Sequence, residues 1–222
     1  MPAGDLASRI AAELEAEVRA TEAYTALAAE FSARAAEALR RADVPAIDRL
    51  RTELVERDTQ LGSRRPQQLA DLVKALQAKL EATQAHRLAL DHYAYVRASL
   101  LAYERRIRPA LAGLDGLRSV LQYVRDMRSM AFERVEAAVP RLEALEKDAE
   151  TVVPPGDLAA VHATLVSALR MAREGIARRR LAVITNNVQA DREASAAAAG
   201  ALLLADRMRE DLVAGLFPPK PR

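Results

Sequence analysis

The strongest apolar pattern of this chain lies in the stretch LDGLRSVLQYVRDMRSMAFERVEAAVPRLEALEKDAETV, residues 114–152. Steps of three and four residues alternate through it without a slip, and such a 3.5-residue repeat predicts one long helix that coils around a partner helix. The positions of this seam are Leu114, Leu117, Leu121, Val124, Arg128, Ala131, Val135, Ala138, Leu142, Leu145, Ala149 and Val152. Pro140 lies inside the run and removes one backbone hydrogen bond, so we expect a kink there.

A second strict heptad seam follows after Val153-Pro154-Pro155-Gly156-Asp157, a helix stop joined to a helix start. Asp157 can cap the new helix. The seam positions are Leu158, His162, Leu165, Leu169, Ala172, Ile176, Arg179 and Val183. Two helices with such seams are typical of coiled-coil-like packing.

The chain before residue 114 predicts three helices with looser apolar stripes. The first runs over about 5–41. The second starts after Asp43, a good N-cap, with Pro45 in the first turn, and ends at Gly62. The third runs from Pro66 to about 108, where Pro109 and two glycines interrupt it by a break or a kink.

A sixth helix is predicted after Asn186-Asn187, which supply a stop and a new N-cap, and it runs to about Gly215. Small side chains on one face of this helix let a neighbouring helix approach closely. That face carries Ala194, Ala198, Ala201, Ala205, Met208 and Leu212. The proline-rich tail 217–222 is expected to be extended or disordered.

Composition also favours helices, because the strong helix formers Ala, Leu, Arg and Glu dominate the 222 residues while aromatic residues make up 4%. Short connections favour antiparallel neighbours. We therefore predict an all-α fold: an elongated up-and-down antiparallel helical bundle of about six helices with coiled-coil-like packing. It forms a single elongated domain over 1–216, with sub-layers 1–108 and 114–216.

Charge and cysteine content narrow the function classes. There are 33 basic and 31 acidic side chains and no Cys, so disulfides, thiolate nucleophiles and Cys-ligated zinc are excluded. The near balance of charge argues against a dedicated nucleic-acid binder. The longest apolar run, 194–205, is too short to span a bilayer, and no signal peptide is visible. We expect a cytoplasmic protein without a membrane span.

Catalytic and metal chemistry is not indicated. None of His86, His92 and His162 has a Glu three residues before it, as a carboxylate-bridged metal site in a bundle requires. Asp91, His92, Tyr93, Tyr95 and Glu104 form the densest polar-aromatic cluster, yet no phosphate loop or nucleophile motif accompanies it. We expect no cofactor, no metal and no enzymatic activity.

The heptad seams predict where a protein partner or a second copy binds. The partner-contacting residues are expected to be Leu117, Leu121, Val124, Arg128, Val135, Leu142, Leu145 and Arg179. Arg128 and Arg179 interrupt the seams, and two explanations stay open. Each arginine specifies a partner, or the seam opens locally and the side chain extends to solvent along its aliphatic stem. A buried arginine would need an acidic neighbour, such as Glu17, Glu81 or Asp191.

Residues 10–61 resemble flagellar export chaperones of the FlgN type, which are cytoplasmic helical hairpins of bacteria. The resemblance rests on Leu14, Tyr24, Leu27, Leu39, the turn Ala42-Asp43-Val44-Pro45-Ala46-Ile47, and Leu50, and the helices after Pro66 depart from it. It implies a chaperone that holds a partner's helix.

Our leading hypothesis is a non-enzymatic scaffold or adaptor that acts through heptad-like helix faces. The chaperone is one alternative. A second is nucleic-acid association through Arg178-Arg179-Arg180. These arginines lie in the last turns of the predicted helix, where positive charges also stabilise the helix by interacting with its dipole.

Overall fold

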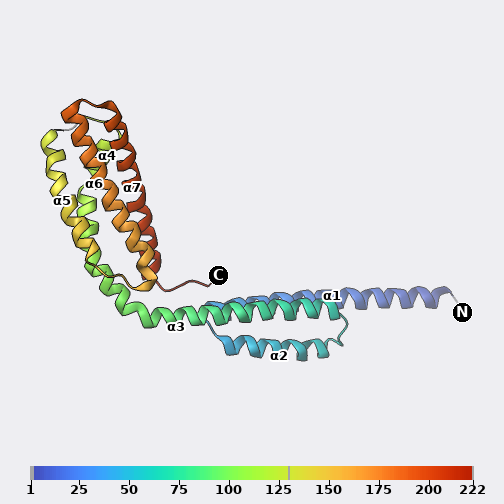
Figure 1. Cartoon of the computed structure of the whole chain (residues 1–222). Coiled ribbons are helices and arrows are strands. Elements are labelled where there is room, and N and C mark those ends of the chain that lie inside the picture. The colour runs from blue at the N-terminus through green and yellow to red at the C-terminus, as the bar shows by residue number, and fades with distance from the viewer. Residues whose placement is uncertain (1–2, 130, 222) are drawn as a thin grey trace. The chain divides into compact units, whose positions relative to one another are not determined.

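Seven α-helices and one short 3-10 helix form the structure, a computed structural model that describes residues 3–129 and 131–221 (Figure 1). They are α1 (Ala3–Arg40), α2 (Val44–Gln60), α3 (Pro66–Gly116), α4 (Arg118–Arg125), α5 (Phe132–Glu150), η1 (Gly156–Leu158), α6 (Ala159–Thr185) and α7 (Val188–Leu216). The described ranges contain no strand, and consecutive helices pack against one another. The predicted all-α helical bundle is confirmed.

The chain divides into two compact units. Unit 1 comprises residues 1–94 with 219–222, and unit 2 comprises residues 95–218. The boundary lies within α3, whereas the sub-layers expected from the sequence meet between residues 108 and 114. Each unit has its own buried side chains.

Unit 1 packs α1, α2 and the first part of α3 around an apolar core. Its main cluster consists of Tyr24, Leu27, Phe31, Ala35, Leu50, Leu54 and Leu76, and Leu69 and Val73 pack partly buried against it. A smaller cluster joins Ala38, Ile47 and Leu80. The apolar sides of α2 and of the start of α3 therefore face this core.

The connections of unit 1 follow the predicted turn chemistry. The carboxylate of Asp43 accepts a hydrogen bond from the backbone N–H of Ala46 at 3.0 Å, so Asp43 is the N-cap of α2. Gly62 has a φ of +80°, a left-handed conformation that favours glycine and ends the α2 region. The N-cap at Asp43 and the stop at Gly62 are both confirmed.

The prediction of one continuous helix over 114–152 is wrong. The chain leaves helical geometry after Arg125, and residue 130 in this break lies outside the described residues. Met127 adopts a φ of +51°, while its N–H and that of Arg128 bond back to Val124 and Tyr123 and close the end of α4. Leu121 and Val135 are nevertheless both buried, as the heptad pattern predicts. They are covered by different helices, because α4 packs mainly on α7 and α5 packs on α6. The heptad spacing therefore predicts which side chains are buried, but it does not predict that they lie on one continuous helix.

Two further boundaries differ from the expected ones. α3 continues through Pro109 to Gly116 instead of ending near Arg108. Pro109 lies on the exposed side of α3, so the carbonyl that loses its N–H partner can bind water.

The start of α6 also differs from the expected one. α6 begins at Ala159, directly after η1, and its N-cap residue is Leu158, which makes no side-chain cap. Asp157 is therefore not the N-cap of this helix. Pro140 lies inside a continuous α5.

In unit 2, α6 and α7 form a closely packed antiparallel pair. Asn186 turns the chain with a φ of +49°, and the side chain of Asn187 accepts hydrogen bonds from Gln189 and Ala190, as predicted. The predicted small-residue face of α7 is buried, with Ala194, Ala198 and Ala201 against α6. A Cβ on Gly175 would lie 3.1 Å from the backbone nitrogen of Ala198, which confirms the close approach of the two helices.

This contact predicts a strong effect of volume at Gly175. Gly175→Val should lower the free energy of unfolding by about 2 kcal/mol or more, because the new side chain meets backbone that cannot move aside. The matched control is Gly156→Val, since a Cβ there meets nothing within 4 Å; its effect should stay within about 0.5 kcal/mol. Urea unfolding followed by circular dichroism measures both. Equal losses in the two variants would contradict the assignment.

Candidate protein-interaction surface

The first half of α1 carries an apolar stripe that the rest of unit 1 does not cover. Ile10, Leu14 and Val18 are 50%, 62% and 56% exposed, and α1 runs past the turn that joins α2 and α3 (Figure 1). Farther along the same helix, Tyr24 and Phe31 are 2% and 0% exposed. We call Ile10, Leu14 and Val18 the α1 stripe.

Beyond the stripe, a polar cluster fastens α1 to the turn between α2 and α3. The guanidinium of Arg65 donates to the hydroxyl of Thr21 at 2.9 Å and pairs with Glu17. One turn further, the buried hydroxyl of Tyr24 donates to the carboxylate of Asp58. Burial, and then the neighbouring Asp58, raise the pKa of Tyr24, so the phenol stays protonated. The covered part of α1 begins at this cluster.

With these polar residues included, α1 has a heptad seam of its own. The steps alternate four and three through Ile10, Leu14, Glu17, Thr21, Tyr24, Ala28, Phe31, Ala35 and Ala38. The second half of this seam packs into unit 1, and the first half faces solvent. Sequence reasoning missed this seam because Glu17 and Thr21 interrupt its apolar pattern.

The partner-contacting residues predicted from the long heptad run lie inside unit 2. Leu117, Leu121, Val124, Val135 and Leu142 are buried, and Leu145 is half-buried. Leu145 fills the space beside Gly113 of α3. These side chains hold the unit together, so contact with a partner through them stays a prediction that would require the helices to separate.

The two seam arginines have different environments. The Arg179 side chain is 11% exposed, pairs with Asp191 and donates to the backbone carbonyl of Arg128 at 2.9 Å. Asp191 is one of the acidic neighbours that the sequence suggested. Arg128 is exposed, with its guanidinium 5.8 Å from the ring centroid of Tyr123. The backbone of Arg128, and not its charge, therefore joins the α4–α5 break to α6.

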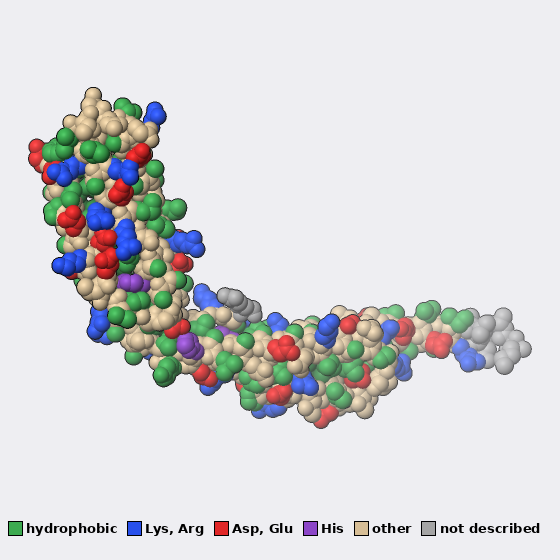
Figure 2. All heavy atoms as spheres, in the orientation of Figure 1, with side chains coloured by type: hydrophobic (Ala, Val, Ile, Leu, Met, Phe, Trp, Pro, Cys, Tyr) green, Lys and Arg blue, Asp and Glu red, His purple; other side chains and the backbone are tan. Residues whose placement is uncertain are grey.

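The basic run of α6 is neutralised within unit 2. Arg178 pairs with Glu174 and Glu193, and Arg180 pairs with Glu136. Upstream, Arg170 and Arg173 both bond the largely buried carboxylate of Glu146, at 3.2 and 3.1 Å. Figure 2 shows basic and acidic side chains interleaved over the visible face of unit 2. A phosphate would have to compete with these carboxylates.

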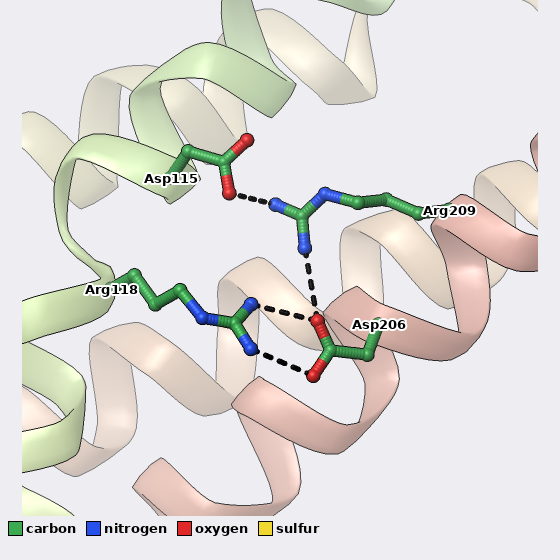
Figure 3. Close-up of polar contacts among 4 residues, drawn as sticks. All are labelled: Asp115, Arg118, Asp206 and Arg209. Atoms are coloured by element: carbon green, nitrogen blue, oxygen red, sulfur yellow. Dashed lines mark hydrogen bonds and ion pairs between the residues drawn. The ribbon is translucent and has the colours of Figure 1, made fainter.

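A four-residue network joins the α3–α4 turn to α7 (Figure 3). Arg118 donates to both oxygens of Asp206 at 2.7 and 2.9 Å, while Arg209 donates to Asp206 at 3.2 Å and to Asp115. The hydrogen bonds from Arg118 hold the pKa of Asp206 below its usual value. The bidentate geometry fixes the orientation of α4 on α7.

The polar-aromatic cluster of α3 does not converge on a pocket. Asp91, His92 and Tyr95 are exposed, and Asp91 pairs with Arg87 at 3.2 Å. His86 is buried in unit 1. In unit 2, Nδ1 of His162 lies 3.0 Å from the hydroxyl of Tyr103, whose pKa burial raises to about 12. Over residues 3–129 and 131–221, no group of three or more His, Asp or Glu residues is arranged to hold a metal ion.

No protein-family model matches this chain, and no curated protein or solved structure matches it either. None of the described helices is long and apolar enough to cross a membrane. The exposed surfaces of the protein are therefore the guide to its function.

The Glu146 cluster allows a paired test of burial. Glu146→Ala should lower the free energy of unfolding by about 1 to 2 kcal/mol, because a 10% exposed carboxylate loses two arginine contacts. Glu150 also pairs with Arg170 but is 45% exposed, so Glu150→Ala should cost about 0.5 kcal/mol or less. Urea unfolding compares the two variants. A larger loss at Glu150 would show that burial does not set the strength of these pairs.

The His162–Tyr103 contact predicts a dependence of stability on pH. Burial lowers the pKa of His162 below its ordinary value of 6.5, so the unfolded chain binds the proton more readily than the folded chain. Stability should be full above about pH 6.5 and fall as pH drops through the lower pKa of the folded state. Urea midpoints measured across this range should vary less with pH in His162→Gln. Identical profiles for the wild type and His162→Gln would refute the role of His162.

Proposed function

We propose that this protein is a non-enzymatic helical scaffold or adaptor that binds protein through the α1 stripe. The observation that carries the proposal is the contrast along one helix, with Leu14 62% exposed and Phe31 fully covered. An amphipathic helix gains most of its stability from packing of its apolar face. Another helix that packs on the α1 stripe would therefore cover its exposed apolar side chains.

The strength expected from the stripe alone is modest. Full burial of a Leu, Ile or Val side chain is worth about 1.5 to 3 kcal/mol, and about half of each stripe side chain is still exposed. The three residues therefore contribute roughly 3 kcal/mol, against the 8 kcal/mol or so of a micromolar complex. A partner must also contact the charged residues beside the stripe.

The heptad side chains of unit 2 have a supporting role in this proposal. Their burial gives a packed helical unit, and arginines on its surface pair with carboxylates. The pairing of Arg178 and Arg180 with carboxylates gives the nucleic-acid alternative less support. An export-type chaperone would use the same α1 stripe to hold a partner helix, and it remains the alternative within the binding class.

Site-specific photo-crosslinking tests the proposal. With benzoylphenylalanine at position 14, irradiation in an extract of the native host should join the chain to a second polypeptide, because the stripe faces its partner. The same probe at Leu203, which is 70% exposed on α7, is the matched control. Ile10→Glu with Val18→Glu should suppress the adduct at position 14. An adduct no stronger at position 14 than at 203 would remove the α1 stripe as the binding surface.

A further inference from the structure

Acidic residues flank the α1 stripe. At about 100° per residue around the helix, four glutamates lie within about 100° of Leu14, whereas both arginines lie about 140° away on the opposite side. The glutamates are Glu13, Glu15, Glu17 and Glu22, and the arginines are Arg9 and Arg19. Glu17 already pairs with Arg65. The stripe thus presents an apolar strip with an acidic border, which suits a basic partner surface.

The part of α3 in unit 2 has the opposite character. Its buried side carries Leu100, Tyr103 and Ile107. Its outward side carries Ala98, Leu101, Ala102 and Arg105 at steps of three and four residues, bordered by Arg97 and Arg106. We call these six residues the α3 face. Glu104 is the one acidic residue between 95 and 109, and it pairs with Arg108 at 2.9 Å. Three positive charges remain on this face.

We propose that the α1 stripe of one copy docks on the α3 face of a second copy. The inference rests on the proposed function and names the partner of its binding surface. Leu14 and its neighbours would pack on the alanines and Leu101, while Glu13 and Glu22 approach the arginines that border the α3 face. Small side chains such as Ala98 and Ala102 let the incoming helix approach closely.

Pairing of two α1 stripes with each other is less favourable. An antiparallel pair centred on Leu14 sets Glu13 against Glu15 of the other copy, and a parallel pair sets each glutamate beside its counterpart. Like charges in such positions oppose association. The α3 face offers opposite charge instead, and it is present at the same concentration as the stripe because both belong to one chain.

The two surfaces differ, so the contact is heterologous. A docked pair leaves one α1 stripe and one α3 face unoccupied, on different copies, so further copies can add head to tail. Association should therefore grow with protein concentration. It should also weaken with salt, because the bordering charges are exposed.

Sedimentation velocity on the full chain tests the inference. The weight-average mass should rise above 24.2 kDa with concentration, and an increase from about 0.05 to about 0.5 M sodium chloride should weaken association roughly tenfold. Leu14→Glu should abolish association by placing a charge in the stripe. Arg105→Glu with Arg106→Glu should abolish it by reversing the charge of the α3 face. Leu203→Glu is the control and should associate like the wild type.

Mixing the two defective proteins gives the decisive result. Leu14→Glu keeps an intact α3 face and the double arginine variant keeps an intact stripe, so the mixture should form a one-to-one dimer of about twice the monomer mass. Circular dichroism checks that both variants stay helical, and Arg105→Gln with Arg106→Gln replaces the double variant if it does not.

Three results would overturn the inference: a wild-type chain that stays monomeric, a double arginine variant that still self-associates, or a mixture that stays monomeric. A position-14 adduct with a different protein, from a chain that is monomeric by itself, would overturn this inference and leave the proposed function standing.

Discussion

A long amphipathic helix is stable in water only where something covers its apolar side, and this constraint organises the whole chain. Unit 2 meets it internally: α6 and α7 pack through glycine and alanine, and α4 and α5 divide one heptad seam between two neighbours. Unit 1 meets it over the second half of α1 only. The α1 stripe is one place where the requirement stays open within a single copy.

Charge follows the same division. In unit 2, arginines of α6 and α7 pair with carboxylates from other helices, as in the network of Arg118, Asp206 and Arg209 (Figure 3). Such pairs are worth little individually at the surface, yet they orient helices and leave little net field. Around the α1 stripe and along the α3 face, charge of one sign instead borders an apolar strip. Unmatched charge beside uncovered apolar surface is what directs an interaction.

Much of the fold could be predicted from the sequence because local chemistry determines it. Asp43, Gly62 and Asn187 act at the positions where capping and turn preferences place them. The break between α4 and α5 could not be predicted, because Met127 carries no turn preference and the heptad spacing continues across it. Burial of Leu121 was foreseeable, but its partner could have been another copy or, as found, helices of the same unit.

The binding surface was harder to locate for the same reason. Periodicity alone predicts that Ile10 and Phe31 are equally buried. They differ in exposure because α2 and α3 pack over Phe31 and leave Ile10 uncovered. Hydrogen–deuterium exchange at increasing protein concentration can show whether a second copy covers the α1 stripe. Amides of residues 8–21 should exchange faster than those of 24–38 in dilute solution and become protected as concentration rises. Exchange over 8–21 that is independent of concentration, with or without added partner, would contradict it.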